Sequence, residues 1–415
     1  MCAMFSVYDT VFQWARRQRT SFAEMRFASS GSGIVEPGGG ALVYRLKRWP
    51  ELPSRIRTAD VLRALSVMSS RPINRHWILA HSKLRAEDVD VVPGASGGPK
   101  WLVLEGLDRF LFGEFFDRPR DRPLHLIGSS VGSWRTACLA MRDPAAAVDR
   151  LREGYIEQRY ATRPPPALVT RTITAIIDGL LGETGAEEIL SHPWARLHVI
   201  TAECRGLAAS ERAAVQMLGL AAAAAGNLVS RRMLAMQMRR VIFNTAGDDS
   251  PFRALADLPT QHRPLTRGNL RHALLASGSI PMVLQGVPIP GEPPGIHRDG
   301  GVIDYHLDLD FGPGEGLVLY PHFYPHVVPG WFDKGLRWRR AWWQNFRRAV
   351  ILAPTAEFVA RLPGGKIPDR NDFYRMPDAE RIRVWRTVAA ASAQLADELR
   401  ELIATGRIAE AVRPL

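Results

Sequence analysis

The 415-residue sequence is poor in cysteine and has no long, purely apolar run. Its three cysteines, Cys2, Cys138 and Cys204, are odd in number and lack the spacing of metal ligands, so we expect buried thiols in a reducing compartment. No apolar segment of signal-peptide length follows the arginines of Ala15–Phe22. The longest uncharged run, Ala213–Ser230, is mostly alanine and predicts a packed helix or cap element rather than a membrane span. We therefore expect a cytoplasmic protein.

Acidic residues are also under-represented, since 54 Lys and Arg stand against 42 Asp and Glu and leave a net charge of +12. Residues 1–85 hold fourteen of the basic residues and five of the acidic ones. A basic chain favours nucleic acid or anionic lipid as a partner, and solvated arginines are the plainer interpretation. Ser29–Gly40 is rich in Gly and Ser and is typical of a linker. The helical periodicity of Thr58–Leu84, interrupted at Pro72, resembles a helix-turn-helix in outline only.

From residue 86 onward, short apolar runs alternate with helical patterns. Strands are predicted at Val89–Gly94, Leu124–Gly128, Arg196–Glu203, Arg239–Ala246 and Gly316–Phe323. Helices are predicted at Pro99–Gly113, from Ser133 to Met141, and from Asp378, as N-cap, to Thr405 with Gly406 as its stop. This alternation predicts an α/β fold with a mostly parallel central sheet flanked by helices.

The segment from His125 to Arg135 reads HLIGSSVGSWR and contains the pattern G-x-S-x-G. Gly128 and Gly132 flank Ser130, with a predicted strand before them and a predicted helix after them. A sharp strand-to-helix turn lifts the central serine out of the sheet, and side chains two positions to either side would clash. The helix N-terminus favours negative charge at that point. Ser130 is therefore the candidate nucleophile, and a plain glycine- and serine-rich turn is the alternative.

A second strand-to-helix connection, GASGGPKW at Gly94–Trp101, precedes the serine, as an oxyanion loop does in this topology. Gly97 and Gly98 can bring bare backbone N–H groups close to a developing oxyanion, where each donor changes the rate by about a hundredfold or more. Lys100 adds a positive charge beside them. A phosphate-binding P-loop is the rival interpretation, but Trp101 follows Lys100 where that motif requires Ser or Thr.

The candidate base is Asp299, which is followed by Gly300 and Gly301 in the segment HRDGGVIDYH. A carboxylate held against a serine hydroxyl in a dry site can act as the base directly, without an imidazole. A Ser–Asp–His triad is the alternative. The downstream histidines that could complete it include His272, His297, His306, His322 and His326.

In this order, the three segments resemble the patatin-like phospholipases. That family carries a glycine-rich oxyanion loop ending in a basic residue, a G-x-S-x-G elbow and a D-G-[GA] motif. ASGSIPMVLQGV at Ala276–Val287 is similar to another segment of the family, A-S-x-[AS]-x-P, and the resemblance spans about residues 89–310. It implies a three-layer α/β sandwich. The sequence departs from the family at Ser96, where the glycine run usually begins, and at Trp101, where glycine usually follows the basic residue.

The resemblance also implies roles for individual residues. Ser130 is implied as the nucleophile and Asp299 as the base of a Ser–Asp dyad. The implied oxyanion donors are Gly97 and Gly98. The implied supporting residues are Lys100, Gly128, Gly132, Gly300 and Gly301.

The stretch Pro329–Val350 combines tryptophan with arginine and holds a single acid, Asp333. Its large aromatic residues are Trp331, Phe332, Trp338, Trp342, Trp343 and Phe346, and its basic residues are Lys334, Arg337, Arg339, Arg340, Arg347 and Arg348. Such a mixture suits a lipid–water interface, where rings lie at headgroup level and cations meet phosphates. A helix whose aromatic residues cover the sheet is the equal alternative, and single-stranded nucleic acid fits poorly beside a hydrolase site.

Together, these observations predict a serine acyl hydrolase of lipid esters, with phospholipids or lysophospholipids as substrates, working through an acyl-enzyme. No cofactor and no metal is expected, because the spacing of Asp304, Asp308 and Asp310 fits no calcium loop and predicts a solvated turn. The expected domains are a basic extension over 1–85, a patatin-like catalytic domain over 86–355 and a helical segment over 356–415. We expect peripheral contact with the inner, anionic membrane surface. The alternatives are a triad esterase, an acyl transferase and a non-catalytic membrane- or partner-binding module.

Overall fold

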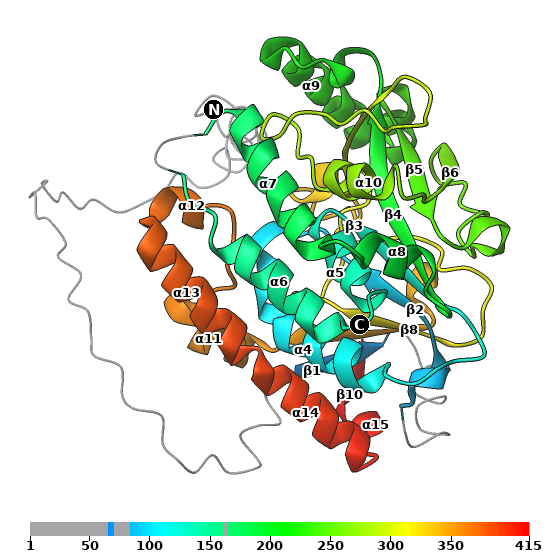
Figure 1. Ribbon diagram of the computed structural model, residues 1–415, viewed down its shortest axis with the longest axis vertical. Helices are drawn as coiled ribbons and strands as arrows, with labels where there is room; N and C mark the ends of the chain where they lie inside the picture. The colour runs from blue at the N-terminus through cyan, green and yellow to red at the C-terminus, as the bar shows by residue number, and fades with distance from the viewer. Residues whose placement is uncertain (1–64, 70–83, 161–163, 415) are drawn as a thin grey trace, which may run out of the picture. The chain divides into compact units, whose positions relative to one another are not determined.

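The computed structural model describes residues 65–69, 84–160 and 164–414, and a single sheet runs through them (Figure 1). Nine strands lie in the order β10-β1-β9-β8-β2-β3-β4-β5-β6, and a further strand, β7, pairs with β4. Their bounds are β1 Leu65–Ser69, β2 Val89–Gly94, β3 Leu124–Ser129, β4 Ala195–Cys204, β5 Met238–Asn244, β6 Thr260–Pro264, β7 Ile296–Asp299, β8 Leu317–Pro321, β9 Ala349–Pro354 and β10 Val412–Pro414.

The sheet is mostly parallel, as predicted. The central strands β9, β8, β2, β3 and β4 run parallel to one another, whereas β5 and β7 run antiparallel to β4 and β1 runs antiparallel to β9. The five predicted strands correspond to β2, β3, β4, β5 and β8 within one or two residues at each end. Their continuous apolar sequences suit this position, because central parallel strands are buried on both faces.

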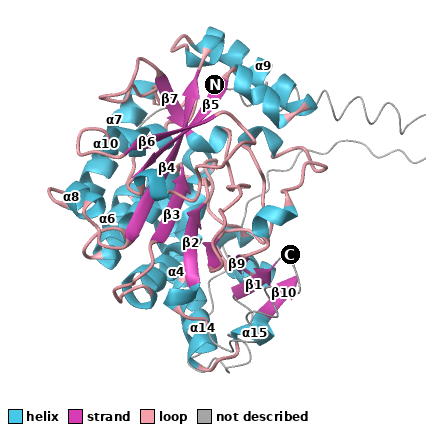
Figure 2. Cartoon of the chain, turned by 90° about the vertical axis from the view of Figure 1, so that its right-hand side faces the viewer, coloured by secondary structure: helices cyan, strands magenta, loops and turns pink. Residues whose placement is uncertain are grey.

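Helices flank the sheet, and the α/β fold class is confirmed. Helix α5 packs directly on β2, β3 and β4, and α10 packs on β4 and β7. Figure 2 shows α4, α6, α7 and α8 along one side of the central strands. The bounds are α4 Glu105–Phe110, α5 Val131–Leu139, α6 Pro144–Ile156, α7 Pro166–Leu181, α8 Gly185–Leu190, α9 Ala213–Val229, α10 Leu270–Ser277, α11 Ala356–Arg361, α12 Asp372–Arg375, α13 Asp378–Ala391, α14 Ala393–Ala404 and α15 Ile408–Ala411.

Two predicted helices are interrupted. The stretch from Pro99 to Gly113 begins as the 3₁₀ helix η3 (Gly98–Leu104), continues as α4 and ends in a π-helical turn. The C-terminal stretch divides into α13 and α14 at Ser392, whose hydroxyl donates to Ala389 O (2.6 Å) and accepts from the Gly106 amide (2.8 Å). A tertiary contact with α4 therefore breaks a helix whose local sequence favours continuity.

The predicted caps of that C-terminal stretch had different outcomes. Asp378 is the first helical residue rather than the N-cap, which is Pro377. The Asp378 carboxylate instead accepts from the Tyr160 amide and pairs with Arg381. Gly406 follows α14 with φ +69°, so it ends the helix in the left-handed region as predicted.

The helical interpretation of Thr58–Leu84 is wrong where the structure describes it. Leu65–Ser69 is strand β1, which pairs with β9 on one side and β10 on the other. The edge of β9 needs hydrogen-bond partners, and five residues of this stretch supply them. The sheet therefore takes in residues that the sequence assigned to the N-terminal extension. The Ser29–Gly40 linker lies outside the described residues.

The alanine-rich run forms α9, and Gly219, Leu220 and Ala223 lie on its buried face, as expected for a packed helix. No helix in the described part of the chain has the length and apolar character needed to span a bilayer. Cys138 and Cys204 are buried and unpaired, in line with the expected buried thiols. Burial raises the pKa of the Cys204 thiol to about 12, so this side chain packs as an inert apolar group.

Candidate active site

Ser130 lies on the elbow between β3 and α5, with φ 58° and ψ −137°. A non-glycine residue rarely adopts a positive φ, and such strain is typical of functional sites. A Cβ on Gly128 would collide with the backbone of Ser133, and one on Gly132 with the carbonyl oxygen of Gly94. The two flanking glycines are therefore required sterically, as the motif predicts.

The predicted oxyanion loop lies beside this elbow. Gly94 at the end of β2 is paired with Gly128 at the end of β3, so the loops that follow the two strands leave the same edge of the sheet. Gly98 has φ +55°, which favours glycine, and it is the first residue of η3. At the start of a helix the N–H groups lack intrahelical partners. Among the described residues, the Gly97 and Gly98 amides donate to no acceptor, so both remain available to a ligand.

Strand β4 brings Asp299 to the serine. It pairs with β3 as far as Ile200, which lies opposite Ser129, and from the next residue it pairs with β7, so that Thr201 lies opposite Asp299. A Cβ on Gly300 would collide with the carbonyl oxygen of Ile200. The first glycine of the D-G-G motif therefore permits the close passage of this turn across β4.

The Ser130 hydroxyl donates to Asp299 Oδ2 at 2.9 Å. The second carboxylate oxygen, Oδ1, accepts from the Gly301 amide at 2.7 Å. Both side chains are buried, and burial raises the pKa of the Asp299 carboxyl above its ordinary value, against the opposing effects of Arg370 and of the hydrogen bond from Ser130. A desolvated carboxylate is a stronger proton acceptor than an exposed one.

A serine that the sequence analysis did not single out holds the elbow in place. Ser277, at the end of α10, accepts from the Ser130 amide (2.9 Å) and donates to Ile200 O (2.7 Å). Ser277 belongs to the Ala276–Val287 segment, which the sequence analysis noted as similar to a family segment without giving this serine a role. A second pair, Ser96 and Ser129, joins the oxyanion loop to the elbow through a 3.0 Å hydrogen bond between their hydroxyls. The departure at Ser96 therefore supplies a loop contact that glycine could not make.

Two further cations near the dyad were not predicted as site residues. Arg370, between β9 and the C-terminal helices, lies close enough to Gly98 that a Cβ there would be 3.3 Å from its Nε. Lys334 holds its ammonium nitrogen 3.8 Å from the centre of the Tyr305 ring. The predicted cation, Lys100, lies in η3, and burial and the neighbouring Arg370 lower its pKa to about 8. No local pattern distinguishes Arg370 or Lys334 from the many other basic residues of this chain.

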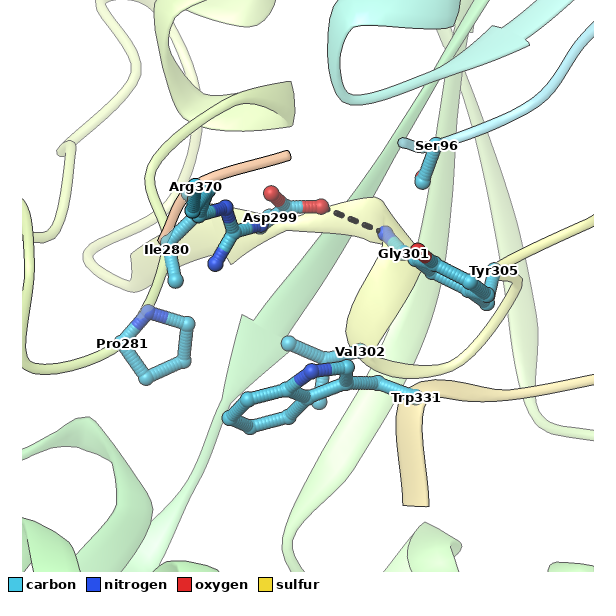
Figure 3. Close-up of a pocket in the computed structure, with 9 residues that line it drawn as sticks. All are labelled: Ser96, Ile280, Pro281, Asp299, Gly301, Val302, Tyr305, Trp331 and Arg370. Carbon is cyan, nitrogen blue, oxygen red and sulfur yellow. Dashed lines mark hydrogen bonds between the residues drawn. The ribbon is translucent and has the colours of Figure 1, made fainter. Parts of the chain in front are cut away.

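Figure 3 shows the small pocket beside Asp299, which Arg370 lines and to whose lining Lys100 and Lys334 do not belong. Asp299 and Gly301 lie at its inner end, with Arg370, Tyr305 and Trp331 around them. The pocket contains about 240 Å³ of space, part of which is open solvent, so the volume that it encloses is smaller than a long acyl chain needs. A long acyl chain therefore requires the covering residues to move.

The histidines lie away from the serine. The Nδ1 atom of His297 is hydrogen-bonded to Thr201 Oγ1 (3.0 Å). The Nδ1 atom of His306 accepts a hydrogen bond from the Val328 amide (3.0 Å). The Nδ1 atom of His322 contacts the backbone of Tyr324, and His326 stacks on the Tyr324 ring. Burial lowers the pKa of His297 to about 4 and that of His322 to about 3, so both rings are neutral. In the described part of the chain no histidine is hydrogen-bonded to Ser130 or Asp299.

The three aspartates after the D-G-G motif have separate partners. Asp304 is fully buried and pairs with Arg240 through two hydrogen bonds of 2.6 and 2.7 Å. Asp308 accepts from the Trp342 amide and Asn345, and Asp310 from the Gly312 amide. The solvated-turn interpretation is therefore wrong for Asp304, which forms a buried ion pair. Among the described residues no group of three or more His, Cys, Asp or Glu side chains is arranged to hold a metal ion.

The aromatic-basic stretch neither forms one helix nor lies wholly on the surface. It contains two short 3₁₀ turns, η9 (Trp331–Asp333) and η10 (Trp343–Phe346). Phe332 and Phe346 are buried, and Trp331 lines the pocket. Arg348 hydrogen-bonds the backbone of the β8 region, and Arg339 donates to Asn227 O. The exposed residues of the stretch include Trp338, Trp342 and Trp343, which are 62%, 57% and 42% exposed, and Arg337, Arg340 and Arg347.

A serine on a strand–helix elbow, bonded to a buried carboxylate beside free backbone amides, defines the class of α/β acyl hydrolases. Residues 103–306, just under half of the chain, match the family model of the patatin-like phospholipases. The matching family is the one that the ordered motifs resemble.

A solved structure also matches the chain, that of the type III effector protein ExoU, with 14% sequence identity and a TM-score of 0.23. The match covers 80% of this chain and 55% of that one, so the chain corresponds to little more than half of that protein's length. No curated protein matches the chain significantly in sequence.

Proposed function

We propose that this protein hydrolyses fatty-acyl esters of phospholipids or lysophospholipids by means of a Ser130–Asp299 dyad. The observation that carries the proposal is the 2.9 Å hydrogen bond from the Ser130 hydroxyl to a buried carboxylate. Two features support it: the family match over residues 103–306 and the position of the free Gly97 and Gly98 amides beside the elbow.

In the proposed reaction Asp299 accepts the proton of Ser130 as Oγ attacks the acyl carbonyl carbon. The Gly97 and Gly98 amides donate to the oxyanion of the tetrahedral intermediate. The intermediate collapses, the alcohol leaves with the proton, and the acyl group stays on Ser130. Asp299 then takes a proton from water, whose oxygen attacks the acyl-enzyme and releases the fatty acid. The hydrogen bond from Gly301 to Asp299 Oδ1 leaves Oδ2 directed at the serine.

The triad esterase is less well supported, because the histidines His297, His306 and His322 are engaged elsewhere and hold a low pKa through burial. Acyl transfer to an acceptor other than water uses the same acyl-enzyme, so only the products distinguish it. A non-catalytic binding module offers no reason for a strained serine next to a desolvated carboxylate.

The test is incubation of the purified protein with a mixed panel of phospholipids, lysophospholipids and neutral glycerides, followed by mass spectrometry of the products. We expect free fatty acid and the matching deacylated lipid in equal amounts. A new acyl ester in place of fatty acid would identify a transferase. Absence of any product from every lipid of the panel, with lipid binding retained, would identify the binding module and reject the proposed function.

We further propose that the protein reaches its substrate at an anionic membrane surface, as a cytoplasmic protein bound peripherally. Arg339, which follows the exposed Trp338 in the chain, contacts the end of α9, where Leu228 and Val229 are 51% and 82% exposed. The hydrogen bond from Arg339 to Asn227 O ties the two segments together. Apolar side chains surrounded by arginines are typical of interfacial binding.

Replacement of Arg337, Arg340 and Arg347 by glutamine tests this surface. Each basic residue near an anionic membrane contributes about 1 kcal/mol, so we expect at least tenfold weaker binding to anionic vesicles in low salt. The wild-type protein should bind anionic vesicles more tightly than zwitterionic ones. Its binding to anionic vesicles should weaken as the salt concentration rises, because salt screens the charges over about 10 Å. Arg339 and Arg348 are left unchanged, since their contacts are structural.

The matched control removes the same charge from another surface, with Arg171, Arg375 and Arg383 changed to glutamine; all three are exposed. Vesicle sedimentation measures binding, and a soluble short-chain ester measures the dyad. Equal loss of vesicle binding in both triple variants would mean that net charge, rather than this surface, attracts the membrane. Loss of the soluble-ester rate in the first variant alone would place the stretch in the folded core.

A further inference from the structure

Three cations around the dyad have no anionic partner. Lys100, Lys334 and Arg370 come from η3, from the loop after η9 and from the segment before α12. Among the described residues none of the three forms an ion pair or a side-chain hydrogen bond. Elsewhere the acids near them are already in use, since Asp369 and Asp372 both pair with Lys366. Lys334 is exposed and Lys100 and Arg370 are partly exposed, so an anion arriving from solution can reach all three.

Of the three cations, Arg370 lies at the pocket of the dyad, and Lys334 lies over the ring of Tyr305, which also lines that pocket. Arg370 lines the pocket beside Asp299. Burial, followed by the charges of Arg370 and Lys100, lowers the pKa of Lys334, which means that these groups repel one another. Asp299 opposes that effect on Lys334, and Asp369 and Asp372, which both pair with Lys366, oppose it on Lys100. The pocket therefore carries an excess of positive charge, and a cleft with low-dielectric walls concentrates such a field on a ligand.

The ring of Tyr305 fixes where the Lys334 ammonium lies. The ammonium stands 3.8 Å from the ring centre, a cation–π distance, and the Tyr305 ring lines the pocket. Tyr305 is buried, and its carbonyl oxygen accepts from the Ser96 amide in the oxyanion loop (2.9 Å). The cation is thus held at the rim of the site without a carboxylate that would compete with a ligand for it.

We propose that Lys100, Lys334 and Arg370 bind the phosphate of the lipid whose acyl ester Ser130 cleaves, and that the enzyme prefers substrates with a phosphomonoester headgroup. This inference rests on the proposed function for its substrate. A phosphomonoester carries close to two negative charges near neutral pH and suits a pocket with more cations than carboxylates around it. A planar guanidinium is suited to phosphate oxygens, and ammonium groups add point charges. A choline headgroup brings its own cation into this field and binds less well.

The alternative for Arg370 is a direct effect on catalysis, because it lies next to Gly98 and lowers the pKa of Asp299. That role stabilises the same oxyanion and the same carboxylate whatever the headgroup, so its loss slows all esters equally. Phosphate binding instead changes the ratio between substrates. The ratio therefore separates the two roles.

The kinetic test compares two substrates that share one short acyl chain, a monoacylglycerol and the corresponding monoacylglycerol phosphate, both below their micelle concentrations. For Arg370→Gln we expect the ratio of kcat/KM, phosphate over neutral, to fall at least tenfold, with a smaller fall for Lys334→Gln and with partial rescue in Arg370→Lys. The assays are run at pH 7.5, because loss of Arg370 raises the pKa of Asp299 and shifts the acid limb of the rate upward. Equal loss on both substrates would overturn the proposal.

The matched controls are Arg375→Gln and Arg383→Gln, which remove exposed charges that belong neither to this site nor to the proposed membrane surface. Both should keep the wild-type ratio. A similar fall in these variants would mean that the overall charge, and not the site, selects the headgroup. Thermal unfolding of each variant shows whether it has folded, and Arg370→Lys keeps the test decisive if Arg370→Gln is unstable.

A binding test is independent of turnover. In a Ser130→Ala background, calorimetry measures decyl phosphate, decanol and inorganic phosphate. We expect decyl phosphate to bind at least tenfold more tightly than decanol, and Arg370→Gln to remove most of that difference. Inorganic phosphate binding as tightly as decyl phosphate would indicate a site for free anions and would overturn the headgroup assignment. Headgroup-dependent binding without any ester hydrolysis by the Ser130 protein would reject the proposed function alone, whereas hydrolysis without headgroup preference would reject this inference alone.

Discussion

Ser130→Ala abolishes covalent labelling by a fluorophosphonate probe and lowers acyl-ester hydrolysis on the order of 10⁵-fold or more, as expected when a nucleophile is removed. The hydroxyl is the group that donates to Asp299, and Ala retains the Cβ and the elbow. The Ser130 amide still donates to Ser277, so the variant should fold. Mass spectrometry of the labelled wild-type protein identifies the modified peptide.

Ser129→Ala is the matched control, because Ser129 is adjacent and equally buried but bonds Ser96 instead of the carboxylate. It should keep full labelling at Ser130, with a modest loss of rate from the loosened oxyanion loop. Labelling that persists in Ser130→Ala, at Ser129 or at another residue, would show that the nucleophile lies elsewhere.

Asp299→Asn lowers the hydrolysis rate by about 10³- to 10⁴-fold, since an amide cannot accept the serine proton. The shape of the side chain and the hydrogen bond from Gly301 can be retained. Because burial raises the pKa of Asp299 above its unfolded value, the ionised carboxylate destabilises the folded state once the pH exceeds the unfolded pKa. We therefore expect an unfolding midpoint at neutral pH that is equal to or higher than that of the wild type.

The pH dependence gives a second measure of the same residue. Asp299 acts as a base only when ionised, so activity should rise with pH through a pKa above that of an ordinary aspartate. Single alanine variants of His297, His306, His322 and His326 serve as controls and should retain most activity. A histidine variant whose loss equals that of Asp299→Asn, or an acid limb at the usual pKa of histidine that disappears with it, would favour the triad.

Much of the site was predictable because it depends on local sterics. The glycines around Ser130 and after Asp299 mark places where the backbone passes so close to another segment that a Cβ would collide. The apolar runs of β2, β3 and β4 mark strands buried on both faces. Short-range causes such as these leave a pattern that can be read in a few consecutive residues.

Other local predictions were wrong or incomplete because a distant partner overrode the local preference. Leu65–Ser69 reads as part of a helical segment, and pairing with β9 makes it a strand. The helix that begins at Asp378 is interrupted at Ser392 by its contact with Gly106. Asp304 stands in what reads as an acidic turn, and Arg240 turns it into one half of a buried ion pair.

The sequence by itself determined the elbow, the D-G-G turn, the order of the motifs and the alternation of strands and helices, since each follows from the conformational limits of neighbouring residues. Only the tertiary structure decided that Ser130 meets Asp299, because that contact depends on β4 pairing with β3 up to Ile200 and with β7 from Thr201. It also decided that Lys334 and Arg370 stand at the dyad while Arg337 and Arg375 face solvent. Charges of one kind are alike in sequence, and their surroundings after folding set their partners and their pKa.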